Sequence, residues 1–373
     1  MDRKQEQSGK VDNLTRRKFI RNGATAAAGL AAGLGATGCE SMQFGKAEKP
    51  RSYNPEMEYR PLGKTGLSIS AVCMGGHWKR VDKMVPGVFK TGSWLSADIE
   101  SDGFKKNRRD VVSRCIEHGI NYVDACTWQE VAAYSEALRG RRDAMHLGFS
   151  WYQEEMRNEK YRTVDALLAT LDKGMSKVKL DYVDVWRITM HEQSGRHTEA
   201  EVDQMMGALE KARKQGKVRF TGFSSHDRKH IKGMIETYPE VVQVVVTPYT
   251  AKSKALEKDS LFDTLQEYGV GFFGIKPFAS NSLFKGDSSP DSPTADQDNR
   301  LARMAIRYIL CNPAITAPIP GMINPQQVDN VVKAVKERRQ LDLAEAKELE
   351  EAMDQAWANL PADYQWLKNW EYV

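Results

Sequence analysis

The chain has 373 residues, 41% of them hydrophobic, and a formal net charge of +4 at pH 7. Residues 1–38 hold seven Lys/Arg and three Asp/Glu, a net of +4, so the rest of the chain is close to neutral. This balance disfavours a nucleic-acid interface, which needs a basic patch. The five cysteines are widely spaced and lack a Cys-x-x-Cys pair, so we expect neither a disulfide framework nor a cysteine-rich metal site.

The first segment has the pattern of an export signal. Arg16 and Arg17 precede a soft apolar run over residues 23–38, and the pair resembles the twin-arginine signal read by the Tat translocase. The run is about 16 residues long and mostly Ala and Gly, too short and too weakly apolar for a membrane-spanning helix. We therefore expect residues 1–38 to be a signal peptide that directs the folded protein through the Tat export machinery.

Two processing sites are compatible with this signal. Residues 36–39 (ATGC) resemble a lipobox with Ala where Leu is usual, which implies a lipid anchor on Cys39. Cleavage by the ordinary signal peptidase near Gly38 is the alternative. Residues 39–56 are polar and are expected to form a tether. The expected location is the periplasm, either as a free protein or as a membrane-anchored lipoprotein.

Short β-type runs then alternate with amphipathic helical patterns. The predicted strands are residues 70–74, 122–124, 145–149, 183–188, 218–222, 242–246, 271–275 and 315–319. The predicted helices are residues 105–117, 163–178, 202–214, 228–237, 261–267, 299–310 and 325–337. Eight such repeats predict an α/β fold, a (β/α)8 TIM barrel over residues 57–373. A further helix after Leu343 leads into an aromatic-rich tail that either packs on the barrel or covers its mouth.

Five ordered segments resemble the aldo-keto reductase family. They are residues 59–67 (YRPLGKTGL), 119–124 (GINYVD), 180–185 (LDYVDV), 216–224 (GKVRFTGFS) and 319–328 (IPGMINPQQV). The resemblance runs from Met57 to about Ala334. It implies a barrel closed at its bottom by a β-hairpin at residues 59–67, and carbonyl reduction with NADPH or the reverse reaction.

The same resemblance implies a catalytic tetrad of Asp, Tyr, Lys and His that is largely lost here. The Asp maps to Asp124, whereas the Tyr, Lys and His positions hold Gln129, Ser150 and Thr189. The family's Tyr donates a proton, which a neutral glutamine amide cannot do at ordinary pH. We expect His191, two residues beyond Thr189, to be a replacement acid.

Strand parity adds a second expectation. Residues two apart on a strand share one face, so Arg187, Thr189 and His191 are expected to face into the barrel. A buried carboxylate requires a cation. We therefore predict an ion pair between Asp124 and Arg187, and the candidate catalytic residues are Asp124, His191, Gln129 and Arg187.

The resemblance implies a binding site for NADP or NAD, and only some of the residues of that site are present here. The expected contacts are Ser224 and Ser225 with the nicotinamide amide, Tyr249 with its ring, Lys276 with the pyrophosphate, and Gly321, Gln327 and Asn330 around the adenosine. Ile323 stands where a cation usually meets the 2′-phosphate, so selectivity for NADP is doubtful.

Three functions are open at this point. The first is an exported oxidoreductase of aldo-keto reductase type that acts on a carbonyl or sugar-like small molecule with altered catalytic residues. The second is a noncatalytic binding protein or pseudoenzyme on the same barrel, and the third is a lyase or hydrolase at the same mouth. Three histidines, His77, His191 and His226, follow strand ends, but no metal-binding motif accompanies them, so we expect no metal.

Overall fold

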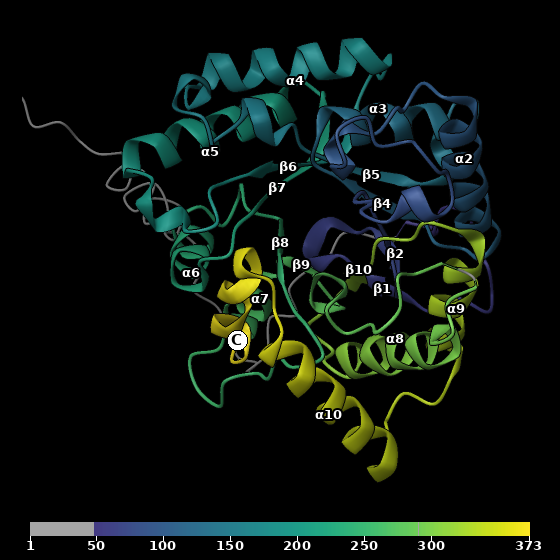
Figure 1. Ribbon diagram of the computed structural model, residues 1–373. Helices are drawn as coiled ribbons and strands as arrows, with labels where there is room; N and C mark the ends of the chain where they lie inside the picture. Colours follow the sequence, from purple (N-terminus) through teal and green to yellow (C-terminus); the bar gives the residue numbers. More distant parts are fainter. Residues whose placement is uncertain (1–47, 290) are drawn as a thin grey trace, which may run out of the picture. The chain divides into compact units, whose positions relative to one another are not determined.

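The computed structural model describes residues 48–289 and 291–373, which belong to one compact unit. Eight parallel strands, each hydrogen-bonded to the next in chain order, form its centre (Figure 1). They are β3 (Met74–Gly75), β4 (Tyr122–Ala125), β5 (His146–Phe149), β6 (Val183–Thr189), β7 (Val218–Ser224), β8 (Val244–Pro248), β9 (Gly271–Ile275) and β10 (Ala317–Ile319). Gly75 N donates to Pro320 O at 2.8 Å and closes the ring between β3 and β10. The predicted (β/α)8 barrel is confirmed.

A β-hairpin closes the bottom of the barrel, as the resemblance implied. Its strands, β1 (Tyr59–Pro61) and β2 (Ser68–Ser70), pair antiparallel. Gly63 in the turn has a φ of +51°, and a Cβ there would lie 2.3 Å from Gly269 O, so the close approach requires glycine. The first barrel strand was expected at residues 70–74. It begins later, at Met74, because Ser68–Ser70 pairs within the hairpin instead.

Nine helices are described in residues 48–289 and 291–373, and they cover the outside of the barrel. They are α2 (Asp102–Glu117), α3 (Trp128–Ala137), α4 (Val164–Val178), α5 (Glu199–Lys214), α6 (Arg228–Thr237), α7 (Leu261–Tyr268), α8 (Ala295–Leu310), α9 (Pro325–Lys336) and α10 (Leu343–Ala358). The helix α3 was not among the predicted helices. A capping box of Thr127 and Glu130 starts it, and that sequence signal was readable. No helix of the described residues is long and apolar enough to cross a membrane.

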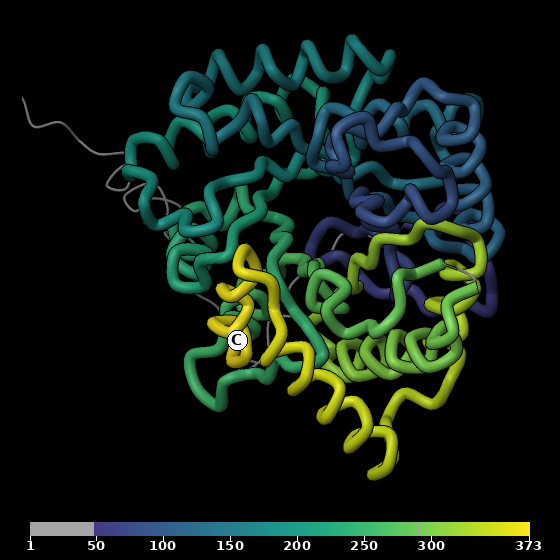
Figure 2. Tube along the Cα trace, in the orientation of Figure 1, coloured from purple at the N-terminus to yellow at the C-terminus, as the bar shows by residue number. Residues whose placement is uncertain are grey.

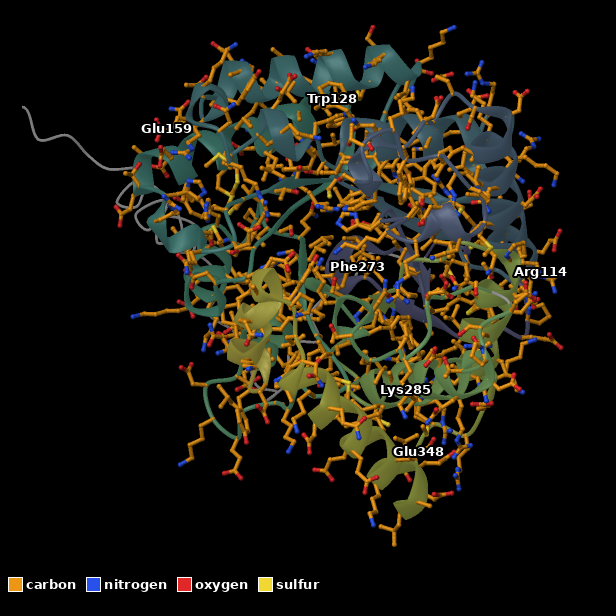
Figure 3. The ribbon with its side chains drawn as sticks, viewed as in Figure 1. Arg114, Trp128, Glu159, Phe273, Lys285 and Glu348 are labelled. Atoms are coloured by element: carbon orange, nitrogen blue, oxygen red, sulfur yellow. The ribbon has the colours of Figure 1, made fainter. Side chains whose placement is uncertain are left out.

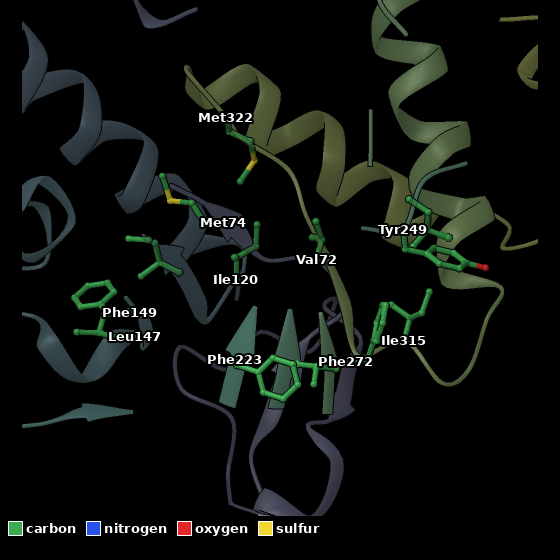
Figure 4. Close-up of a cluster of buried hydrophobic side chains, with 14 of the residues drawn as sticks. Val72, Met74, Ile120, Leu147, Phe149, Phe223, Tyr249, Phe272, Ile315 and Met322 are labelled. Atoms are coloured by element: carbon green, nitrogen blue, oxygen red, sulfur yellow. The ribbon is translucent and has the colours of Figure 1, made fainter. Parts of the chain in front are cut away.

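The core has two layers because strand side chains alternate between the barrel interior and the helices. On β9, Phe273 points inward and stacks on Tyr122 with ring centroids 4.3 Å apart. Phe272, next in the chain, lies in the outer layer with Phe149 and Phe223 (Figure 4). Phe273 accordingly lies near the centre of Figure 3, whereas labelled charged residues such as Glu348 lie at the periphery.

The C-terminal tail folds back onto the barrel after α10 (Figure 2). It contains a 3-10 helix, η9 (Ala362–Trp370), and its last residues pair with the segment after β8. Lys254 N donates to Glu371 O at 2.7 Å, and Val373 N donates to Lys254 O at 2.8 Å. Ser260 Oγ donates to Val373 O at 2.9 Å. The tail is therefore held beside the carboxyl end of β8, at the rim of the barrel.

The start of the described chain also contacts the barrel. Arg51, in the segment predicted as a tether, lies 3.0 Å from a carboxylate oxygen of buried Asp184 and donates to Met145 O at 2.8 Å. Ser52 and Asn54 also bond to the barrel, through Ala144 O and Glu117 O, so this part of the segment is held against it. The predicted signal peptide, the lipobox at Cys39 and the first part of the tether lie outside the described residues.

Candidate active site

A cavity of about 650 Å³ lies at the carboxyl ends of the barrel strands, where active sites of this architecture are found. Its floor includes Asp124 and Arg187, and its sides include Lys276 after β9 and the start of α9 at Asn324. Tyr364 and two other residues of the tail line it as well. The tail therefore both packs on the barrel and covers part of its mouth.

The predicted contact between Asp124 and Arg187 is present at the floor of the cavity. Arg187 Nε donates to Asp124 Oδ1 at 2.7 Å, and Nη2 donates to Oδ2. Both side chains are buried. Burial alone would lower the pKa of Arg187, but the Asp124 carboxylate outweighs burial and raises it. Arg187 is therefore a fixed cation, and its Nη1 donates to Thr189 Oγ1 at 3.0 Å.

The positions of the lost Lys and His form a closed polar network. Ser150 Oγ lies 2.7 Å from Thr189 Oγ1 and donates to Glu155 Oε2 at 2.5 Å. Glu155 is fully buried and also accepts from the backbone N–H groups of Thr189 and Trp151 and from the Trp186 indole. Sequence reasoning missed Glu155, which belongs to no motif. With the Asp124–Arg187 pair, these three residues form what we call the paired wall, comprising Asp124, Ser150, Glu155, Arg187 and Thr189.

The opposite side of the cavity carries cations without carboxylate partners. Lys79 Nζ donates to Ser280 Oγ at 3.0 Å and to Tyr364 Oη. Lys276 Nζ lies 5.5 Å from the centroid of the Tyr364 ring. Within the described part of the chain, no carboxylate lies within ion-pair distance of either ammonium group. We call Lys79, Lys276, Ser280 and Tyr364 the cationic wall.

Electrostatics and backbone geometry mark the cationic wall as unusual. Burial lowers the pKa of Lys276, and although burial alone would raise the pKa of Tyr364, the two lysines lower it on balance. Lys276 has a φ of +63°, and residues 279–281 are also left-handed without being glycine. Such strained backbone persists only where the surroundings impose it, and it is concentrated at functional sites.

A histidine–carboxylate pair lies between the two walls. His77, after β3, has Nδ1 2.5 Å from Glu130 Oε1. Glu130 is fully buried and its Oε2 accepts from the backbone N–H groups of Cys126 and Thr127. His77 and Cys126 line the cavity. Sequence reasoning placed His77 after a strand end but did not pair it with Glu130.

The cavity lining contains seven of the eleven predicted site residues, namely Asp124, Arg187, Ser224, Lys276, Gly321, Gln327 and Asn330. His191 is not among the lining residues. Strand β6 ends at Thr189, so the alternation that was expected to turn His191 inward does not extend to it. Its Nε2 instead lies 2.9 Å from Arg196 Nη1, and its Nδ1 accepts from Gln193 N. The placement of His191 does not support a role as the proton donor.

Three further predicted residues lie outside the lining. Gln129 is in the first turn of α3. Ser225 is buried and donates to Ser194 Oγ at 2.7 Å. The ring of Tyr249 packs edge-to-face on Phe262 and Phe272 in the outer layer. Tyr249 follows an inward-facing position of β8 by one residue, so it points toward the helices and is not positioned to stack on a ligand in the cavity.

The residues present fit a nucleotide at the cationic wall and the start of α9. A half-buried ammonium group without a carboxylate, as at Lys276, favours an anionic ligand. The first turn of a helix also favours anions, and Asn324, Gln326 and Gln327 line the cavity there. Asn330 is less available, because its amide contacts Arg303 Nη1 at 2.7 Å and Asn299 O at 3.0 Å.

Comparison with known proteins agrees with this architecture. The sequence model of the Aldo/keto reductase family matches residues 92–354, and the chain belongs to that family. It is 22% identical over 311 residues to the L-galactose dehydrogenase of Arabidopsis thaliana, covering 77% of this chain and 91% of that protein. It is 23% identical over 336 residues to the L-glyceraldehyde 3-phosphate reductase of Escherichia coli O157:H7, covering 76% and 90%.

Among solved structures, the holo form of the aldo-keto reductase AKR11C1 from Bacillus halodurans matches with a TM-score of 0.57 at 18% identity. The match covers 83% of this chain and 99% of that chain. A putative 2,5-diketo-D-gluconic acid reductase B matches with a TM-score of 0.54 at 16% identity, covering 79% of this chain and 91% of that chain. At these identities the likeness shows the shared barrel fold.

Proposed function

We propose that the protein is an exported oxidoreductase that transfers hydride between a nicotinamide cofactor and a carbonyl or sugar-like substrate. One observation carries the proposal: a single cavity joins the Asp124–Arg187 pair to the unpaired Lys276 and the start of α9. The names of two relatives, L-galactose dehydrogenase and L-glyceraldehyde 3-phosphate reductase, support a sugar-like substrate. Membership of the family supports a nicotinamide cofactor.

In this proposal the cationic wall binds the cofactor and the paired wall binds the substrate. Lys276 would hold the cofactor phosphates beside the first turn of α9, and the bound nicotinamide would supply or accept hydride. Arg187, kept cationic and fixed by Asp124, would stabilise negative charge on the substrate oxygen. Ile323 lines the cavity where the resemblance implies a cation, so we expect no strong preference for NADP over NAD.

Export is the second part of the proposal and is supported by the twin arginines at Arg16 and Arg17. The Tat route carries folded proteins, so the chain would leave the cytoplasm with its cofactor bound. The conservative double change of Arg16→Lys with Arg17→Lys should trap a folded precursor in the cytoplasm. Envelope localisation of that double variant would contradict the Tat route. Cys39→Ala tests the lipid anchor separately, because it should release a soluble form.

A noncatalytic binding protein is the second candidate function. The observation that favours it is the closed network of Ser150, Thr189 and Glu155, in which the positions of the lost Lys and His serve the structure. A binding protein would keep the cavity and the anion-binding side but would not turn over a bound substrate.

The test uses protein purified from the envelope after native export. We expect a nicotinamide dinucleotide to be released by denaturation and identified by mass spectrometry. Addition of aldoses or sugar alcohols to the intact protein should change the absorbance of the bound nicotinamide. Protein that carries no dinucleotide, and that binds neither NAD nor NADP when they are added, would contradict the proposal.

A further inference from the structure

We propose that His77, oriented by Glu130, is the residue that donates and accepts the proton at this site, in place of the tyrosine that the family motif would supply. The inference rests on the proposed function, since it names the proton carrier of the same reaction. The geometry assigns the role to two residues from different elements, one in the loop after β3 and one in the first turn of α3.

Glu130 is a hydrogen-bond acceptor that is held in one position. It is fully buried, and its Oε2 accepts from Cys126 N at 2.9 Å and from Thr127 N at 3.1 Å. The same carboxylate completes the capping box that starts α3. Burial alone would raise the pKa of Glu130, but His77 and these N–H groups lower it on balance. The carboxylate is therefore ionised and held in one position.

The two ring nitrogens of His77 differ in their partners. Nδ1, 2.5 Å from Glu130 Oε1, must carry the proton, because an ionised carboxylate can only accept. Among the described residues, none forms a hydrogen bond with Nε2. The ring packs on Trp94 with centroids 4.5 Å apart, and the side chain is 35% exposed on the cavity wall. One nitrogen is thus fixed and the other is free to meet a ligand.

His77 lies at the reacting end of the cavity. Gly75 lies opposite Asp124 in the β3–β4 register. His77 and Cys126 each follow this pair by two residues, and both line the same cavity as Asp124 and Arg187. The titratable and charged groups around the pair are Asp124 with Arg187, Cys126 and, from the other wall, Lys276.

The proton balance of the step is simple. In the reductive direction the carbonyl carbon gains hydride from the reduced nicotinamide, and the electron pair of the C=O π bond moves to oxygen. The oxygen takes the Nε2 proton of the His77 imidazolium and becomes a hydroxyl. His77 is left neutral, because Nδ1 keeps its proton and donates it in a hydrogen bond to Glu130, and Nε2 regains a proton from water through the open cavity. The oxidative direction reverses each step.

A metal site at the same residues is the competing interpretation. Ligand atoms of His77, Cys126 and Glu130 all lie within 4.8 Å of one another. Both oxygens of Glu130 already accept hydrogen bonds. A proton carrier accounts for these contacts without breaking them.

The test compares three variants of the exported protein. His77→Ala should slow single-turnover hydride transfer by about 10²–10⁴-fold, and added imidazole should restore part of the rate. Glu130→Gln should keep the cap on α3 but turn an amide N–H toward Nδ1, which shifts the pH profile of the rate. His118→Ala is the matched control, because His118 bonds Asp329 at 2.8 Å outside the cavity, and it should react at the wild-type rate.

Full activity of His77→Ala alongside active wild-type protein would overturn the inference while leaving the proposed function intact. Protein that binds dinucleotide but turns over no substrate would overturn both. A readout independent of turnover is the nitrogen NMR spectrum of His77, which should show a protonated Nδ1 and an unprotonated Nε2 at alkaline pH. The opposite tautomer, or tight binding of Zn²⁺ that is lost in both His77→Ala and Cys126→Ala, would contradict the assignment.

Discussion

The paired wall and the cationic wall face one cavity, but they differ in how their charges are balanced. On the paired wall, Arg187 and Asp124 neutralise each other in a two-pronged contact. The buried Glu155 has no cation beside it but accepts hydrogen bonds from neutral donors, among them Ser150 and the Trp186 indole. On the cationic wall, Lys79 and Lys276 have no carboxylate partner in the described residues. A buried charge without a counterion is costly. The comparison therefore identifies the cationic wall as the side that requires a ligand.

The largest expected effect comes from breaking the paired wall. Arg187→Met should lower the free energy of unfolding by about 3–5 kcal/mol, because it leaves the Asp124 carboxylate buried without a cation. Asp124→Asn with Arg187→Met should cost less than the two single changes added together. Urea denaturation of the four proteins measures the coupling.

The exposed pair of Lys106 and Asp110, 2.6 Å apart on α2, is the control for that cycle. Its removal should change the free energy of unfolding by less than about 0.5 kcal/mol. Simple additivity at Asp124 and Arg187 would mean that the two side chains do not stabilise each other, and the contrast between the walls would lose its basis.

Removing a charge from the cationic wall should raise the free energy of unfolding, whereas removing Arg187 should lower it. Burial lowers the pKa of Lys276 below its usual 10.5 in the folded state. Its charge therefore costs folding free energy at every pH below the folded-state pKa, and this cost disappears as the pH rises to 10.5. Lys276→Met should raise the free energy of unfolding of the ligand-free protein at pH 7 and weaken pyrophosphate binding about tenfold or more.

Calorimetric titration with pyrophosphate measures the second effect. Lys252→Met is a suitable control, because Lys252 lies outside the cavity lining and is paired with Asp354 and Glu371. In the wild type, pyrophosphate binding should weaken as the pH rises toward 10.5. Unchanged affinity in Lys276→Met, or a loss of stability equal to that of Arg187→Met, would contradict the assignment of the cationic wall.

A smaller effect is expected from the tail. Tyr364→Phe removes the hydroxyl that accepts from Lys79 but keeps the ring beside Lys276. We expect a loss of about 1 kcal/mol in dinucleotide binding, the usual worth of one hydrogen bond, with no loss of fold. Trp366→Leu is the comparison variant, because it removes the ring stacked on His226 at 4.1 Å. It shows whether the loss of another contact of the tail weakens dinucleotide binding as much as the loss of the Tyr364 hydroxyl does. Equal dinucleotide affinity in Tyr364→Phe and wild type would exclude Tyr364 from the site.

The regular parts of the barrel were predictable from the sequence because strand geometry is periodic. One ordered motif located the hairpin, and the alternation of short β-type runs with helical patterns predicted the barrel. Alternation along β6 was enough to turn Arg187 toward Asp124. The same reasoning failed for His191, because the strand ends before it. The resemblance implied that Tyr249 would stack on the nicotinamide ring, but the Tyr249 ring packs on Phe262 and Phe272 in the outer layer.

The irregular parts of the site depend on how loops fold, which no local pattern encodes. His77 and Glu130 are 53 residues apart, and the loop after β3 brings His77 into contact with Glu130 in the first turn of α3. Lys79 and Tyr364 are 285 residues apart, and only the course of the tail brings them together. One local signal was readable: Thr127 and Glu130 have capping-box spacing, which predicts both the start of α3 and a carboxylate turned back toward the strand end.

We propose that the cavity transfers hydride between a nicotinamide held at the cationic wall and a substrate held at the paired wall. The most direct measurement is a single-turnover reaction of the exported protein, loaded with nicotinamide that carries deuterium at its reactive carbon, with a panel of aldoses and keto-sugars. The account predicts deuterium on the former carbonyl carbon of one product and a much lower yield with Arg187→Met. A tightly bound dinucleotide that never passes its deuterium to any sugar would contradict the account and favour a binding protein.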